Sequence, residues 1–127
     1  MLAGKRVVIC EDEAITVMQL KLILANGGLQ VVGHANNAPE AIELIRNEKP
    51  DIVIMDCNLS GTSGLSAVEE IRRNQDVCVV ILTGYPMDEN RKLAEAAGVA
   101  AWMVKPVTGN ELLERLKRDC GDKSETA

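Results

Sequence analysis

Five short apolar segments alternate with segments of helical spacing, and this alternation restricts the possible folds more than any other feature of the sequence. The apolar segments lie at Lys5–Cys10, Leu29–Ala35, Asp51–Asp56, Val77–Thr83 and Ala100–Val104. Continuous apolar runs such as Val7–Cys10 are typical of strands covered on both faces, as in parallel sheets. The order therefore predicts an α/β fold, with a parallel sheet, helices on both faces and right-handed crossover connections.

The segments between the strands predict the helices. After the first strand, Ile15, Met18, Leu22 and Leu24–Ala25 recur at helical spacing, and Asn26-Gly27-Gly28 ends that helix. Leu59–Gly64 is expected to be a loop by composition. The remaining helices are expected at Ala38–Asn47, Leu65–Asn74, Asp88–Ala97 and from Thr108 or Asn110 to about Arg118.

Composition supports one acidic domain with an aliphatic core. Hydrophobic residues make up 46% of the 127 residues, and the net charge is −5 with no basic run. Direct nucleic-acid binding is therefore not expected, because a polyanion requires a basic surface. The longest apolar stretches, such as Val77–Leu82, are far shorter than the roughly 20 residues of a membrane span. We expect one domain at residues 1–120, a polar tail at 121–127 and no membrane association.

The cysteines show no spacing that is typical of a metal site. The sequence contains no C-x-x-C pair, and the four cysteines are widely separated, at Cys10, Cys57, Cys78 and Cys120. The expected state is that of buried thiols in a reducing cytoplasm. The sequence therefore predicts a cytoplasmic protein without disulfides.

Chemically reactive residues follow the ends of the predicted strands. Glu11-Asp12-Glu13 follows the first strand, Asp56 ends the third, Thr83 ends the fourth and Lys105 follows the fifth. The carboxyl ends of parallel strands meet at one edge of a sheet, where ligands bind in such folds. We therefore expect these side chains to converge on one site.

Charge balance at that edge predicts a divalent cation. Glu11, Asp12 and Asp56 would place three negative charges in one cleft, which Lys105 and a cation would balance. Carboxylate, carbonyl and water ligands favour Mg²⁺. The acidic first turn excludes a nucleotide-binding loop, because such loops need glycines and free backbone N–H groups.

At these residues the sequence resembles the receiver family of two-component response regulators. The resemblance covers roughly Lys5–Lys117 and comprises Glu11-Asp12, Asp56 at the end of Ile-Val-Ile-Met-Asp, Thr83-Gly84, Lys105-Pro106 and the Gly98-x-x-x-Trp102 segment before it. It implies a doubly wound, flavodoxin-like (βα)5 fold with strand order 2-1-3-4-5 in three layers. Glu11 stands where Asp is commoner, Ser60 where proline is usual, and Trp102 where Tyr or Phe is usual.

The resemblance also implies a role for each site residue. Asp56 would accept a phosphoryl group from a histidine kinase or a phosphotransfer protein. Asp12, Asp56 and the backbone carbonyl of Asn58 would bind Mg²⁺ directly, and Glu11 would bind it through water. Lys105 and the metal would stabilise charge on the phosphoryl oxygens, and Thr83 would hydrogen-bond the attached phosphoryl group. The Lys105–Pro106 peptide bond is often cis in the family.

The same resemblance implies a conformational switch. Trp102 would turn inward when Thr83 moves, and the face formed by the fourth helix, fifth strand and fifth helix would then change. That face would contact an output domain, a downstream protein or a second copy of the chain. Asn58 and Tyr85 occupy positions that tune phosphoryl lifetime in the family, and Tyr85 would shield the acyl phosphate from water.

The leading interpretation is a signalling module that is itself phosphorylated and acts on no external substrate. Two other functions are considered beside it. One is a receiver-like scaffold that works without phosphorylation, and the other is a Mg²⁺-dependent phosphohydrolase. Asp56-Cys57-Asn58 lacks the Asp-x-Asp pair of haloacid dehalogenase-like phosphatases, which argues against the second. His34, the only histidine, is expected to be structural or exposed, and Cys57 is expected to have no redox role.

Overall fold

A five-stranded parallel sheet forms the centre of the molecule. The computed structural model describes residues 2–56, 58–59, 62–84 and 88–121. The sheet runs in the order β2-β1-β3-β6-β7, with every neighbouring pair parallel. Numbered along the chain, its own strands have the order 2-1-3-4-5, which confirms the predicted fold class. The strands are β1 (Arg6–Cys10), β2 (Gln30–Ala35), β3 (Ile52–Met55), β6 (Cys78–Thr83) and β7 (Ala101–Val104).

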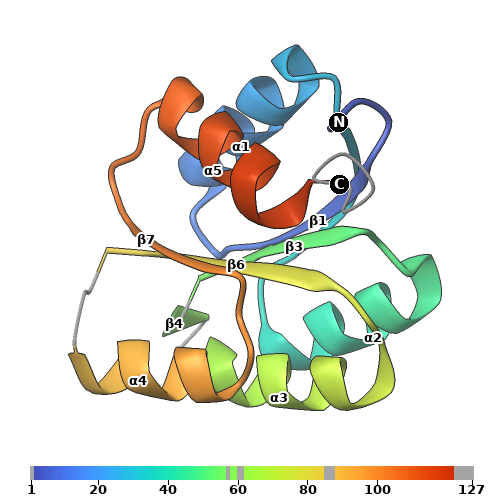
Figure 1. Cartoon of the computed structure of the whole chain (residues 1–127). Coiled ribbons are helices and arrows are strands. Elements are labelled where there is room, and N and C mark those ends of the chain that lie inside the picture. Colours follow the sequence, from blue (N-terminus) through green and yellow to red (C-terminus); the bar gives the residue numbers. More distant parts are fainter. Residues whose placement is uncertain (1, 57, 60–61, 85–87, 122–127) are drawn as a thin grey trace, which may run out of the picture.

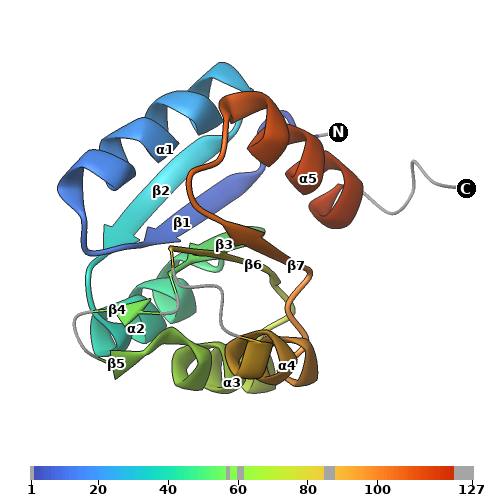
Figure 2. The ribbon, with the colours of Figure 1, turned by 90° about the vertical axis from the view of Figure 1, so that its left-hand side faces the viewer.

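Helices cover both faces of this sheet. One face carries α1 and α5, and the other carries α2, α3 and α4, as Figures 1 and 2 show. Their bounds are α1 (Ala14–Asn26), α2 (Ala38–Glu48), α3 (Gly64–Asn74), α4 (Asp88–Ala96) and α5 (Gly109–Cys120). The alternation of strands and helices therefore gives the three layers that were predicted. Within the described ranges, none of these helices combines the length and apolar character needed to cross a bilayer.

Alternating side chains of the strands fill two separate cores. In β3, Ile52 and Ile54 pack with α1 and α5, whereas Val53 and Met55 pack with α2 and α3. All four side chains are buried. Because both faces of the central strands are covered, polar side chains can reach solvent only at the strand ends.

The first helix forms where it was expected, but its buried face differs from the predicted periodicity. Ile15, Met18 and Leu22 are 66–72% exposed, and the buried residues of α1 are instead Val17, Leu20 and Leu24. Almost every turn of this helix carries several apolar residues, so spacing alone does not identify the face that packs on the sheet. The helix thus presents an apolar stripe to solvent, defined by Ile15, Met18 and Leu22.

Side-chain caps fix the beginnings of two helices. The Asn37 side chain accepts a hydrogen bond of 2.9 Å from the backbone N–H of Glu40 at the start of α2. At the start of α5, the Thr108 hydroxyl accepts one of 3.1 Å from the backbone N–H of Glu111. Of the two caps proposed for the last helix, Thr108 is the one used. The helix ends at Cys120, two residues beyond the predicted Arg118.

The segment after β3 contains a short antiparallel pair of strands that the sequence did not predict. β4 (Asn58–Leu59) pairs with β5 (Thr62–Ser63), and all of these residues except Asn58 lie in the segment Leu59–Gly64 that was expected to be a loop. Each strand is two residues long, which is too short for an alternating hydrophobic pattern to indicate it.

The expectation of four thiols is wrong for two cysteines. Cys78 and Cys120 form a disulfide with a Cα–Cα distance of 5.8 Å and a sequence separation of 42 residues, and Cys10 is a buried free thiol. The fold brings the start of β6 to the end of α5, which sequence spacing does not reveal. Closing a loop of this length stabilises a folded domain by about 4 kcal/mol in the chain-entropy estimate. Cys57 lies outside the described residues.

Two leucines of α1 test which face of the helix packs on the sheet. Leu24 is fully buried and Leu22 is 66% exposed. We predict that Leu24→Ala lowers the free energy of unfolding by about 2–5 kcal/mol, because it leaves a cavity. The matched Leu22→Ala change should alter it by no more than about 0.5 kcal/mol. Urea unfolding of both variants measures the difference, and a larger loss in Leu22→Ala than in Leu24→Ala would show that the helix packs on its other face.

Candidate phosphoryl-acceptor and metal site

Backbone hydrogen bonds between neighbouring strands place the acidic residues at one edge of the sheet. The backbone N–H of Asp56 donates to the carbonyl of Cys10 over 3.0 Å, directly after β3. The backbone N–H of Glu11 donates to the carbonyl of Ala35 at the end of β2, also over 3.0 Å. The segments after β1 and β3 are therefore fixed side by side, and their carboxylates lie close together.

Three carboxylates at this edge could hold a metal ion. Glu11, Asp12 and Asp56 each offer one oxygen, and these oxygens lie within 4.8 Å of one another. Glu11 is 2% exposed and Asp56 8%, whereas Asp12 is open to solvent. Two nearly buried carboxylates beside an exposed one, all with hard oxygen donors, match the chemistry of a small divalent cation that keeps part of its water.

Lys105 supplies the positive charge of the site. Its Nζ forms a close ion pair with Glu11 Oε1 and lies 3.3 Å from Asp56 Oδ2. The backbone N–H of Lys105 donates to the carbonyl of Thr83 over 2.7 Å, which anchors the lysine to the end of β6. The Lys105–Pro106 peptide bond is cis, as the family resemblance implied. The predicted acceptor, acids and lysine therefore meet in one place.

Burial and crowding of charge shift the ionisation of this cluster. Burial, and then the neighbouring Asp56 carboxylate, raise the pKa of Glu11 from 4.5 to about 7, although Lys105 opposes the shift. Burial acts to lower the pKa of Lys105, but hydrogen bonding and charge from Glu11 and Asp56 outweigh it and raise that pKa. When Glu11, Asp12 and Asp56 are ionised, they place three negative charges beside one ammonium group, which favours binding of a second cation.

Two further side chains, those of His34 and Glu13, lie against this cluster. His34 Nε2 is 3.1 Å from the backbone carbonyl oxygen of Glu11, so this histidine is structural and holds the start of the acidic segment. Glu13 Oε1 lies 3.6 Å from Lys105 Nζ and adds a third carboxylate around the ammonium group. The run Glu11-Asp12-Glu13 indicated the second of these, but nothing in the sequence indicated that His34 packs there.

The remaining predicted residues that the structure describes lie on three different strands. Thr83 is fully buried at the carboxyl end of β6, next to β3, and pairs with Val104 of β7. Trp102 pairs with Ile81 and is half-buried against the core beneath α2, α3 and α4. The backbone of Asn58 begins β4. Tyr85 and Ser60 lie outside the described residues, so their predicted roles stay predictions.

A family comparison agrees with this arrangement. Residues 7–117 match the model of the response regulator receiver domain. The chain belongs to the response regulator receiver family. The receiver is a signalling module of two-component systems, and this one has the acidic edge, the strand-three aspartate and the lysine placed together.

Individual relatives place the receiver among regulators of different lengths. It is 35% identical to the transcriptional regulatory protein PdtaR of Mycobacterium tuberculosis over 113 residues, which are 89% of this chain but only 55% of PdtaR. It is also 35% identical to the chemotaxis protein CheY of Thermotoga maritima, over 91% of this chain and 97% of CheY. The chain thus spans about half the length of PdtaR and nearly all of CheY.

A solved structure of similar fold contains a metal ion. The receiver domain of the sensor histidine kinase PA1611 from Pseudomonas aeruginosa, with a magnesium ion coordinated in its active-site cleft, superimposes with a TM-score of 0.82 at 27% identity. The match covers 94% of this chain and all of that domain.

The pKa of Glu11 predicts how the metal-free receiver responds to pH. Since this pKa is about 7 in the folded state and about 4.5 when unfolded, the folded protein keeps the proton to higher pH. The free energy of unfolding should therefore fall by roughly 1–3 kcal/mol as the pH rises from 4.5 to 7. Above pH 7 it should no longer change with the ionisation of Glu11. Urea unfolding in EDTA measures this slope. Glu11→Gln should flatten it, and the exposed Glu43→Gln should not; an unchanged slope in Glu11→Gln would contradict the assignment.

Proposed function

We propose that Asp56 accepts a phosphoryl group from a phosphohistidine of a histidine kinase or phosphotransfer protein. The observation that carries the proposal is the meeting of Asp56 with Lys105 and with two further carboxylates that could hold a metal ion. A carboxylate nucleophile beside a fixed ammonium group and a cation site is suited to phosphoryl transfer, which depends on positioning and charge stabilisation.

The transfer exchanges one phosphorus bond for another. An Asp56 carboxylate oxygen attacks the phosphorus atom, a P–O bond forms, and the P–N bond to the donor imidazole breaks. The leaving nitrogen of the imidazole keeps the electron pair of the P–N bond. If the other ring nitrogen already carries a proton, the imidazole leaves as a neutral group; otherwise the ring takes up a proton. Lys105 Nζ lies 3.3 Å from Asp56 Oδ2. It is therefore placed to stabilise the negative charge on the phosphoryl oxygens while the phosphoryl group moves toward Asp56.

Mg²⁺ is the cation that we assign to the acidic edge. Asp12 and Asp56 would bind it directly, with the backbone carbonyl of Asn58, and Glu11 would bind it through water. When bound, Mg²⁺ would neutralise charge on the phosphoryl oxygens. Oxygen donors, an open side at Asp12 and room for water favour Mg²⁺ over Ca²⁺. The magnesium ion in the PA1611 receiver supports this assignment.

The attached phosphoryl group would be sensed through β6 and β7. Thr83 ends β6 beside the acceptor strand and would hydrogen-bond the phosphoryl oxygens. Its neighbour in the sheet is Val104, and Trp102 lies two residues earlier on that same strand. Movement of Thr83 would therefore reach the face formed by α4, β7 and α5, which we propose as the contact for an output domain, a downstream protein or a second receiver.

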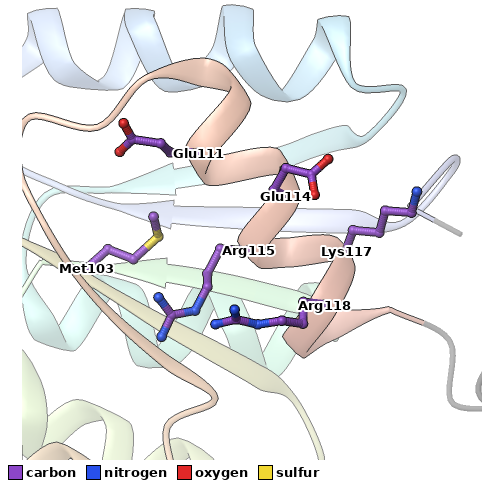
Figure 3. A pocket seen from close by; sticks show the side chains of 6 residues that line it. All are labelled: Met103, Glu111, Glu114, Arg115, Lys117 and Arg118. Atoms are coloured by element: carbon purple, nitrogen blue, oxygen red, sulfur yellow. The ribbon is translucent and has the colours of Figure 1, made fainter.

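That face is not flat. An open hollow of about 680 Å³ lies between α5 and β7, lined by Met103 and by charged side chains of α5 (Figure 3). Arg115 and Arg118, both labelled in Figure 3, each form an ion pair with Asp119, over 2.7 Å and 3.4 Å. A partner at this surface would meet both acidic and basic groups, which favours a protein rather than a nucleic acid.

The exposed side of α1 supports a protein as phosphoryl donor. Ile15, Met18 and Leu22 form its exposed apolar stripe, and Ile15 lies in the first turn, close to the acidic edge. Apolar side chains gathered beside a reactive site are typical of a surface that a partner covers. A donor protein seated on this stripe would bring its phosphohistidine toward Asp56.

The boundaries of the working protein are also part of the proposal. We assign residues 1–120 to the receiver domain and 121–127 to a tail or linker. PdtaR extends well beyond the matched region, whereas CheY does not, so both a longer regulator and a stand-alone receiver fit the comparison. A cytoplasmic location, where a kinase could reach the site, is retained as a prediction.

Phosphorylation of Asp56 can be tested by intact-mass spectrometry. We expect one phosphoryl adduct after incubation with acetyl phosphate and Mg²⁺, none in EDTA and none in Asp56→Ala. The exposed Asp51→Ala change, at the opposite end of β3, is the matched control and should keep the adduct. A folded protein that gains no adduct, and that also fails to bind beryllofluoride, would favour the scaffold that works without phosphorylation.

Trp102 offers a second readout because it is the only tryptophan. We predict that beryllofluoride with Mg²⁺ shifts its fluorescence emission to shorter wavelength, because inward movement takes the indole out of water. The shift should vanish in Asp56→Ala and in Thr83→Ala, which removes the hydroxyl that would move. An unchanged spectrum in protein that binds beryllofluoride would exclude Trp102 as part of the switch.

A further inference from the structure

We propose that Cys78 and Cys120 form a thiol–disulfide exchange site, and that its opening by a dithiol releases the last turn of α5. The bond joins the first residue of β6 to the last residue of α5. It lies at the edge of the sheet opposite to Asp56, because β6 runs from Cys78 to Thr83. The inference is independent of phosphorylation and goes beyond the proposed function.

The disulfide is open to a reagent from the surface. Both cysteines line a hollow of about 350 Å³, together with Lys5, Arg72 and Asp119 among others. Cys78 is half-buried, whereas Cys120 is 6% exposed. We therefore expect an attacking thiolate to reach Cys78 first, since exchange requires direct access to sulfur.

A basic side chain is fixed beside Cys78. Arg72 of α3 donates from Nη1 to the carbonyl of Val77, the residue before Cys78, over 2.7 Å. Arg72 and Lys5 bring positive charge to the hollow, although Asp51, Asp76 and Asp119 line it as well. Because the acidic side chains of this lining outnumber the basic ones, access to the sulfur rather than the charge of the hollow decides where a thiolate attacks.

Reduction of the disulfide needs no reactant other than the dithiol. One thiolate of the dithiol attacks Cys78 Sγ, forms a mixed disulfide and displaces Cys120, which leaves as a thiolate and takes a proton. The second thiol of the reagent loses its proton, attacks the mixed disulfide and displaces Cys78, which is then protonated. Two electrons and two protons pass from the dithiol to the protein, and the dithiol becomes a disulfide.

Reduction should loosen one turn rather than the whole helix. Leu112, Leu116 and Cys120 form the buried stripe of α5 at four-residue spacing, and both leucines are fully buried. They keep most of the helix on the sheet when the bond opens. The last turn would depend on ion pairs of Asp119 with Arg115 (2.7 Å) and Arg118 (3.4 Å), which are partly exposed and therefore weak.

Cys10 gives the site an internal reference. It is a free thiol with no exposed surface, and burial raises its pKa to about 12. Such a thiol is inert in the folded protein. Reaction of the native chain at Cys78 and Cys120 but not at Cys10 would therefore identify the exchange site.

Counting thiols tests the covalent part of the proposal. The chain is equilibrated with oxidised glutathione or with excess dithiothreitol, and is then denatured and alkylated. Its mass is measured by mass spectrometry. The sequence has four cysteines, so we expect two alkyl groups after glutathione disulfide and four after dithiothreitol. Peptide mapping should join Cys78 to Cys120. Four alkyl groups under both conditions, or a bond that includes Cys57, would overturn the proposal.

Amide hydrogen exchange tests its structural part. On reduction, amides of Lys117–Cys120 should exchange on the order of tenfold faster, while those of the central turns of α1 stay unchanged. Cys120→Ser should exchange at the fast rate under both conditions, and Cys78→Ser provides the same test from the other side. The reduced wild-type chain needs no substitution and keeps the test valid if a variant is unstable. Equal exchange rates in the oxidised and reduced forms would overturn the release of α5.

Discussion

The Lys105 ammonium group lies between the carboxylates of Glu11 and Asp56, and the geometry of the acidic edge depends on that contact. Both carboxylates are nearly buried, so their mutual repulsion is little screened by water. Burial, and after it the neighbouring Asp56 carboxylate, raise the pKa of Glu11, and Lys105 offsets this only in part. The folded chain thus retains a site with surplus negative charge. Surplus negative charge of this kind favours a bound cation, as in the metal site proposed for this edge.

The sheet makes this concentration of charge possible. Central strands such as β3 are covered on both faces by aliphatic side chains, and the chain has only one tryptophan and one tyrosine. Polar groups are therefore displaced to the strand ends, and strand order decides which of them meet. Because β3 lies between β1 and β6, Asp56 is flanked by the acidic segment on one side and by Thr83 on the other. Lys105 is held at the site by the hydrogen bond from its backbone N–H to the carbonyl of Thr83.

The sequence predicted what depends on local pattern and strand order, and missed what depends on packing between distant segments. Asp56 and Lys105 were found because apolar runs end at them and parallel strands share an edge. The exposed face of α1 was missed because its apolar residues lie on several sides of the helix. The bond between Cys78 and Cys120 was missed because only the docking of α5 on β6 brings residues 42 positions apart together.

The longer side chain at position 11 has a physical use in this receiver. Glu11 pairs through Oε1 with Lys105, while Oε2 accepts a hydrogen bond of 3.2 Å from the backbone N–H of Asp12. Its own backbone is held by Ala35 and His34 of β2, so the side chain must span the distance from that fixed point to the lysine. An aspartate, shorter by one methylene group, would have to give up one of these two contacts or draw Lys105 away from Asp56. The glutamate therefore lets one residue order the acidic segment and also keep the ammonium group beside Asp56.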